Sequence, residues 1–68
     1  MQESVLTDRF GHCLGYIETS HDGVQIARTR YGRTVGYYDP SSNVTRDRFG
    51  REVGRGNLLA VQIHENQE

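Results

Sequence analysis

Apolar and polar residues alternate in short runs along most of the chain, and turn-forming residues separate the runs. The alternation is clear at Val24 and Ile26 and again at Val35 and Tyr37. A period of two is typical of strands with one buried face. No segment before residue 57 has a helical period. The pattern predicts six short strands, over residues 3–7, 12–19, 24–29, 33–39, 43–47 and 51–55.

A seven-residue motif occurs three times, at residues 10–16, 31–37 and 49–55. Each copy has an aromatic residue, Gly, His or Arg, any residue, an aliphatic residue, Gly, and then Tyr or Arg. An Arg precedes each aromatic residue, and Asp or Thr precedes each Arg. The copies begin 21 and then 18 residues apart, which is room for two short strands and their turns. We interpret the repeat as one β-hairpin unit.

The first glycine of each copy fits a tight turn. Type I turns favour Asp at the first position and Gly at the fourth, as in Asp47-Arg48-Phe49-Gly50. We expect a left-handed glycine, within a three-residue loop that ends in a bulge, at Gly11, Gly32 and Gly50. Ser20 to Gly23 fits the same template, and Asn43 is expected at positive φ in the remaining turn.

The second glycine of each copy falls inside a predicted strand, where glycine marks a bulge or the close approach of another group. By simple alternation, Leu14 and Tyr16 share one face and Gly15 points to the other. We expect the ring of the preceding turn to cover that glycine, as aromatic residues cover strand glycines elsewhere.

The segment after the repeats fits two structures. Leu59, Val61 and Ile63 alternate as in a strand, whereas Asn57 would cap a short helix from Leu58. We favour the strand. We assign residues 1–64 to a single β domain and residues 65–68 to a disordered tail.

Length and composition predict a marginal core. The chain has 68 residues and a mass of 7.8 kDa, a size at which a disulfide, a metal or association usually supplements the core. Cys13 has no intrachain partner, and the three His residues match no zinc spacing, so we expect no metal or other cofactor. We therefore predict a homo-oligomer, a dimer or tetramer, with its contact in the most apolar stretch, at Leu59, Val61 and Ile63.

Nothing in the sequence predicts entry into a membrane. No apolar run approaches the roughly 18 residues of a membrane span. The residues after Met1 lack the basic and apolar regions of a signal peptide. We expect a cytoplasmic location and no membrane partner.

Charge is unevenly distributed. All eight basic residues are Arg, and residues 28–55 carry a net charge of +4 between acidic ends of −3 (residues 1–27) and −2 (residues 56–68). Arginines interleaved with rings form a candidate binding face, which comprises Arg28, Arg30, Arg46, Arg48, Tyr37 and Tyr38. Such a face is typical of platforms for single-stranded nucleic acid. The same arginines can instead stack on the repeated rings and pair with carboxylates, which an overall pI of about 6.3 favours.

No residue pattern predicts catalysis. His12 and Cys13 are adjacent on a predicted strand, so their side chains point to opposite faces. The aspartates fall at turn positions, where a carboxylate accepts hydrogen bonds from nearby backbone amides. We therefore expect no enzyme activity.

Two stretches resemble known families. Tyr38-Asp39-Pro40-Ser41-Ser42-Asn43-Val44-Thr45-Arg46, with Gly50-Arg51 after it, resembles the YD repeat of Rhs-type proteins, whose hairpins wind into large shells. Over residues 8–60 the chain is more similar to small bacterial four-fold beta flower proteins. Their hairpins, with Gly-x-x-x-Gly-Tyr strands, pack around a pseudo-axis. This resemblance implies no catalytic residues, and Arg55 departs from it by replacing Tyr.

The patterns together predict an all-β fold, a meander of six or seven short strands from three imperfect β-hairpin repeats, forming a curled or barrel-like sheet. The function that follows is a small non-enzymatic structural or interaction module that self-associates. The alternative is a module that binds single-stranded nucleic acid through its Arg–aromatic face.

Overall fold

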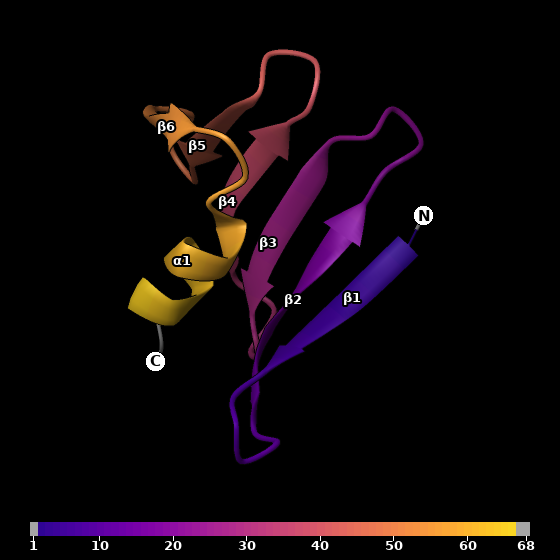
Figure 1. The fold of residues 1–68 in the computed structure, drawn as a ribbon, viewed down its shortest axis with the longest axis vertical. Coiled ribbons are helices and arrows are strands. Elements are labelled where there is room, and N and C mark those ends of the chain that lie inside the picture. The colour runs from indigo at the N-terminus through magenta and orange to yellow at the C-terminus, as the bar shows by residue number, and fades with distance from the viewer. Residues whose placement is uncertain (1, 67–68) are drawn as a thin grey trace.

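A computed structural model describes residues 2–66 as one six-stranded antiparallel sheet followed by a short helix (Figure 1). The elements are β1 (Gln2–Thr7), β2 (Cys13–Thr19), β3 (Gln25–Thr29), β4 (Thr34–Asp39), β5 (Val44–Asp47), β6 (Glu52–Arg55) and α1 (Leu59–Glu65). Strand order follows sequence order, so the sheet is a meander with β1 and β6 at its edges. The predicted all-β meander of six strands is confirmed, and the sheet is curled and open.

The hairpins β1–β2, β3–β4 and β5–β6 turn in the same way. In each, the amide of the turn glycine donates to the carbonyl three residues earlier, at 2.9 to 3.0 Å. The glycines have φ values of 83°, 87° and 86° at Gly11, Gly32 and Gly50. These angles lie in the left-handed region that glycine tolerates best, so the predicted turns are confirmed. Asn43, with φ of 55°, also has the positive φ expected of it.

A β-bulge follows each of these turns. Leu6 pairs with Gly15 and Thr7 pairs with Cys13, so Leu14 is an extra residue without a partner on β1. The register shifts in the same way at the second and third copies of the motif. Because the extra residue interrupts the alternation, Leu14 and Gly15 both lie on the side that α1 covers. The expectation that Leu14 and Tyr16 share a face is therefore wrong.

The rings also lie elsewhere than expected. A side chain at Gly15 would meet Ile63, and one at Gly36 would meet Gln62, so α1 covers these glycines. The turn rings Phe10, Tyr31 and Phe49 are exposed at the ends of the hairpins. None of these rings is among the nearest atoms to a side chain built at Gly15 or Gly36, so they do not cover these glycines.

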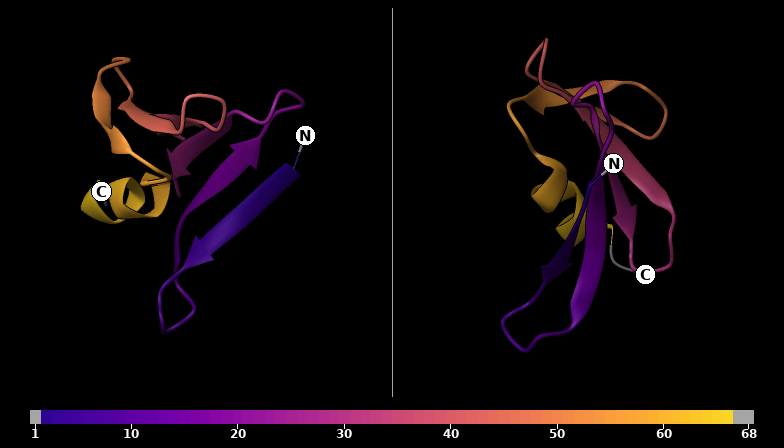
Figure 2. Two further views of the ribbon diagram at one scale, coloured as in Figure 1. Left: turned by 45° about the horizontal axis from the view of Figure 1, so that its top comes forward. Right: turned by 90° about the vertical axis from the view of Figure 1, so that its right-hand side faces the viewer.

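The helix α1 packs across β2, β3 and β4 on one face of the sheet (Figure 2). Its buried residues are Leu59, Gln62 and Ile63, a spacing of three and four that defines one face of a helix. The strand favoured for residues 58–64 is therefore wrong. Small residues at this point of the sheet let one helical face approach closely.

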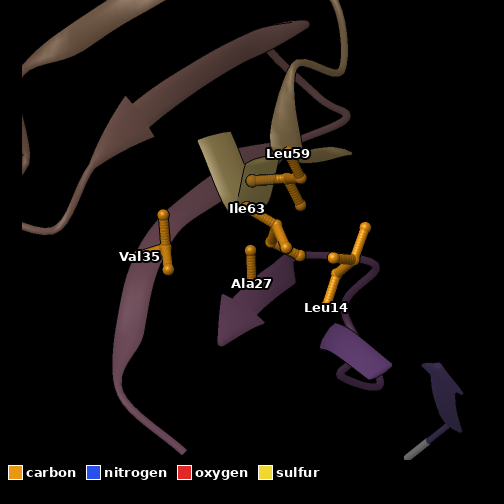
Figure 3. Packing of buried hydrophobic residues seen from close by; sticks show 5 residues of the cluster. All are labelled: Leu14, Ala27, Val35, Leu59 and Ile63. Carbon is orange, nitrogen blue, oxygen red and sulfur yellow. The ribbon is translucent and has the colours of Figure 1, made fainter. Parts of the chain in front are cut away.

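The core lies between α1 and the sheet. Ile63 points toward Ala27, between Val35 and Leu14, with Leu59 above (Figure 3). Leu14 and Val35 are the extra residues of two bulges, so the repeat supplies two of the three residues that the sheet contributes to this cluster.

Polar contacts fix the start of α1. The hydroxyl of Thr45, which is fully buried, donates to the Gly56 carbonyl at 2.6 Å and accepts from the Leu58 amide at 3.0 Å. The side chain of Asn57 donates to Gln25 at 2.8 Å and accepts from the Leu59 amide at 3.2 Å. These bonds connect the segment between β6 and α1 to strands β5 and β3.

The expected tail overlaps the end of α1. Glu65 is the last helical residue, and the backbone amide of Asn66 donates to the carbonyls of Gln62 and Ile63. Residues 67 and 68 lie outside the described residues. Within residues 2–66, no helix combines the length and apolar character needed to cross a membrane.

Candidate functional site

The three copies of the motif place their turns at one end of the strands. Successive antiparallel strands run in opposite directions, so the turns of β1–β2, β3–β4 and β5–β6 lie at one end of the sheet, and the other two connections lie at the opposite end. We call the segments 8–12, 29–33 and 47–51 the tip row. Neighbouring tips are two strands apart, which is roughly 10 Å within a sheet. The twist of the sheet fans them out (Figure 1).

Each tip presents an exposed ring with a guanidinium group against it. The residues Phe10, Tyr31 and Phe49 are 71%, 64% and 68% exposed. The preceding arginine lies 4.9, 5.0 and 4.9 Å from the ring centroid at Arg9, Arg30 and Arg48. These distances are typical of cation–π contacts. The expected stacking of repeated arginines on repeated rings is therefore confirmed.

The first residue of each tip holds the loop backbone. Asp47 accepts hydrogen bonds from the amides of Phe49 at 2.9 Å and Arg51 at 3.0 Å. Asp8 makes the corresponding bonds at 2.8 and 2.9 Å, and the Thr29 hydroxyl makes them at 3.2 and 3.3 Å. The amide of Arg51 and then that of Phe49 lower the pKa of Asp47. The three tips therefore have one backbone geometry and two kinds of acceptor.

Arginines on the strands contact the turn carbonyls of two of the tips. Arg46 donates to the carbonyl of Gly50 at 3.2 Å, and Arg28, at the equivalent position of the motif, approaches the carbonyl of Gly32 at 3.5 Å. Arg28 also pairs with Glu18 across β2 and β3. An ion pair also forms between Arg51 and Asp47, at 3.4 Å. The expected pairing of arginines with carboxylates is thus confirmed at Arg51.

The structure divides the predicted binding face. Tyr37 and Arg46 are register partners on the face that α1 does not cover. Arg30 and Arg48 lie in the tip row. Tyr38 lies on the other face, where it packs against the core and its hydroxyl donates to Asn43 at 2.8 Å. The placement of Tyr38 on the binding face is therefore wrong, because neighbours on a strand point to opposite sides.

The predicted binding face contains no residue of the first tip, and it lacks the rings Tyr31 and Phe49 of the other two. Arg9 and Phe10 repeat the arrangement of the other two tips. The signal that finds them is the motif itself, which places an Arg and an aromatic residue before each turn glycine.

The two ends of the strands differ in charge. Seven of the eight arginines lie in the tip row or contact it from the adjoining strands, and the eighth, Arg55, ends β6 at the opposite end. The turns at that opposite end carry Asp22 and Asp39. Hydrogen bonds from Ser20 and Ser41, respectively, lower the pKa values of these carboxyls, so both are ionised at neutral pH. The strands thus have basic turns at one end and acidic turns at the other.

The residues predicted for self-association differ in availability. Leu59 and Ile63 are fully buried in the core of one chain, whereas Val61 is 52% exposed on α1. Burial within one chain removes Leu59 and Ile63 from contact with a second copy. The strand most open to a second copy is β1, where Val5 is 58% exposed.

The tip row is a raised surface rather than a cavity. The described part of the chain forms no pocket, and within it no three His, Cys, Asp or Glu side chains gather as metal ligands. Cys13 is exposed at the start of β2. Comparison of the chain with protein-family models, curated proteins and solved structures finds no match.

Proposed function

We propose that the chain is a non-enzymatic interaction module that self-associates through β1. The observation that carries this proposal is the exposure of that edge strand: of its six residues, Leu6 alone is half-buried. On its outer side, no strand of residues 2–66 pairs with β1. Unpaired backbone groups at a sheet edge favour the addition of another strand.

The two edges of the sheet are not equivalent. Exposed edge strands are usually protected by Pro, Lys or a bulge. Strand β6 is short, carries a bulge at Val53 and has a charge at each end, at Glu52 and Arg55. Strand β1 is longer, with six residues, has no bulge residue of its own and carries one charge, at Glu3. This difference selects β1 as the contact.

A two-fold antiparallel pairing suits the residues of β1. If Val5 faces its own copy, Glu3 pairs with Thr7 and Ser4 pairs with Leu6. The two glutamates stay apart, and the two copies of Val5 lie opposite each other at the centre, where cross-strand side chains contact directly. The contact is self-complementary, as a two-fold interface requires.

The small core supports the same proposal. The buried hydrophobic residues of the described chain are Leu14, Ala27, Val35, Val44, Leu59 and Ile63. A chain of this size usually needs a further source of stability.

The three hairpins, each with a bulge next to a strand glycine, also support the proposal that the chain is related to the four-fold beta flower proteins that it resembles.

Light scattering on the full chain tests the proposal. We expect the unmodified protein to have twice the 7.8 kDa mass of one chain. Val5→Lys should give a folded monomer, because two charges would meet at the centre of the contact. Val61→Lys, on the exposed side of α1, should remain a dimer. A folded monomer at high micromolar concentration, or a dimer lost with Val61→Lys and kept with Val5→Lys, would refute it.

A further inference from the structure

We propose that the tip row binds single-stranded nucleic acid, with its rings stacking on bases and its arginines contacting phosphates. This function goes beyond self-association and uses the turns at one end of the strands rather than the edge strand β1. Three tips with one geometry each join an exposed ring to a guanidinium about 5 Å away.

The rings are available for stacking. A structural role in the core would bury them, yet each of the three residues is about two thirds exposed. One guanidinium lies against the ring of Phe10 and of Tyr31, whereas the ring of Phe49 has two, from Arg48 at 4.9 Å and Arg51 at 5.5 Å. Bases stack on exposed aromatic side chains with little dependence on sequence, because every base has a π-face.

The charge of the tip row suits a polyanion. Its arginines outnumber its acidic residues: Arg9, Arg30, Arg33, Arg48 and Arg51 against Asp8 and Asp47. In both aspartates one oxygen, Oδ1, accepts the amide hydrogen bonds of the loop, and the Oδ2 of Asp47 pairs with Arg51 at 3.4 Å. Asp22 and Asp39, the acidic residues of the other connections, lie at the opposite end of the strands. The low overall pI therefore hides a local basic surface.

The arrangement favours single strands over duplexes. The rings stand at the ends of separate hairpins, which the twist of the sheet fans out. In a duplex the bases are stacked inside, where such rings cannot reach them. A flexible single strand can turn successive bases toward successive tips.

Fluorescence anisotropy of a labelled oligothymidylate of twenty nucleotides, titrated with the full chain, tests the proposal. A duplex of equal length serves for comparison. We expect the single strand to bind at low salt at least tenfold more tightly than the duplex. Affinity should fall steeply as salt increases, because phosphate contacts release counterions.

Matched variants separate this site from general attraction between charges. Arg48→Ser should weaken binding several-fold and reduce the salt slope by about 0.7, the value for one lost phosphate contact. Arg55→Ser removes the same charge at the opposite end of the strands and should leave binding unchanged. Phe49→Ser should weaken binding about tenfold while the circular dichroism spectrum stays the same.

Three results would overturn the proposal. The first is the absence of binding to the oligonucleotide at low salt. The second is an equal loss of affinity for Arg48→Ser and Arg55→Ser, which would indicate attraction to the net charge alone. The third is binding that depends on Arg48 and not on Phe49, which would point to an acidic protein segment as the partner.

Discussion

At the scale of single residues, the first position of each tip determines how that loop responds to its surroundings. Asp8, Thr29 and Asp47 all accept hydrogen bonds from the amides two and four residues later. A carboxylate does so as an anion, whereas a hydroxyl does so as a neutral group. Loops with one geometry therefore differ in their sensitivity to acid.

Acid should loosen the Asp47 tip. The pKa of this carboxyl is lowered below its ordinary 3.8, first by the amide of Arg51 and then by that of Phe49. The stabilisation is complete above the unfolded pKa and is lost as pH falls through the lower folded value. In an NMR titration, we expect a carboxyl midpoint below 3.8, with the two amides shifting at the same pH. The amides of the Thr29 tip should stay constant, and a carboxyl midpoint at or above 3.8 would contradict this account.

Local chemistry explains which residues could be predicted from the sequence. The turn glycine Gly32 needed only its own four-residue context, because a type I turn has a local signature. The direction of Leu14 did not follow from alternation, since the bulge adds one residue to its strand. Tyr38 lies close to the arginines in the sequence, but strand geometry assigns Tyr37 and Tyr38 to opposite faces.

At the scale of elements, the sheet determines the structure of the last segment. Residues 58–64 satisfy both a period of two and a helical spacing, so the segment alone does not choose between them. The surface of β2, β3 and β4 decides the outcome, because Gly15, Ala27 and Gly36 form a flat area under α1. A choice made by tertiary packing was beyond a local pattern.

A methyl group under the helix should be costly. An alanine at Gly15 would collide with the carbonyl of Arg28 and lie 3.1 Å from the side chain of Ile63. Gly15→Ala should therefore reduce the free energy of unfolding by about 1–3 kcal/mol, as overpacking does. Gly54→Ala is the matched control, since its methyl meets the flexible end of Leu58. Urea denaturation measures both, and equal losses would argue against close packing of α1 on the first glycine.

At the scale of the whole molecule, α1 links strands that are otherwise connected pairwise. The main contacts between strands join neighbours in sequence, whereas α1 contacts β2, β3 and β4 together. The hairpin β5–β6 lies beyond this group, and its bulge residue Val53 remains 48% exposed. The order of the strands followed from the sequence because a meander needs only local turns. The position of α1 did not.

Loss of the helix contact should be felt unevenly across the sheet. Ile63→Ala removes a fully buried side chain and should destabilise the fold by about 2–5 kcal/mol. Val61→Ala, on the exposed side of α1, should change stability little. Hydrogen exchange should show that Ile63→Ala reduces the protection of amides in β2, β3 and β4 most. A loss concentrated in β5 and β6 would refute the central role of α1.

The meander also has a consequence for the order of folding. Each strand pairs with its neighbour in sequence, so the hairpins close over short loops, within about 1–10 μs for an isolated hairpin. A topology of such local contacts favours rapid folding. The helix α1 follows all six strands, and until it docks, Leu14, Ala27 and Val35 have no cover. During synthesis from the N-terminus, the apolar face of this sheet therefore remains open to aggregation until α1 leaves the ribosome.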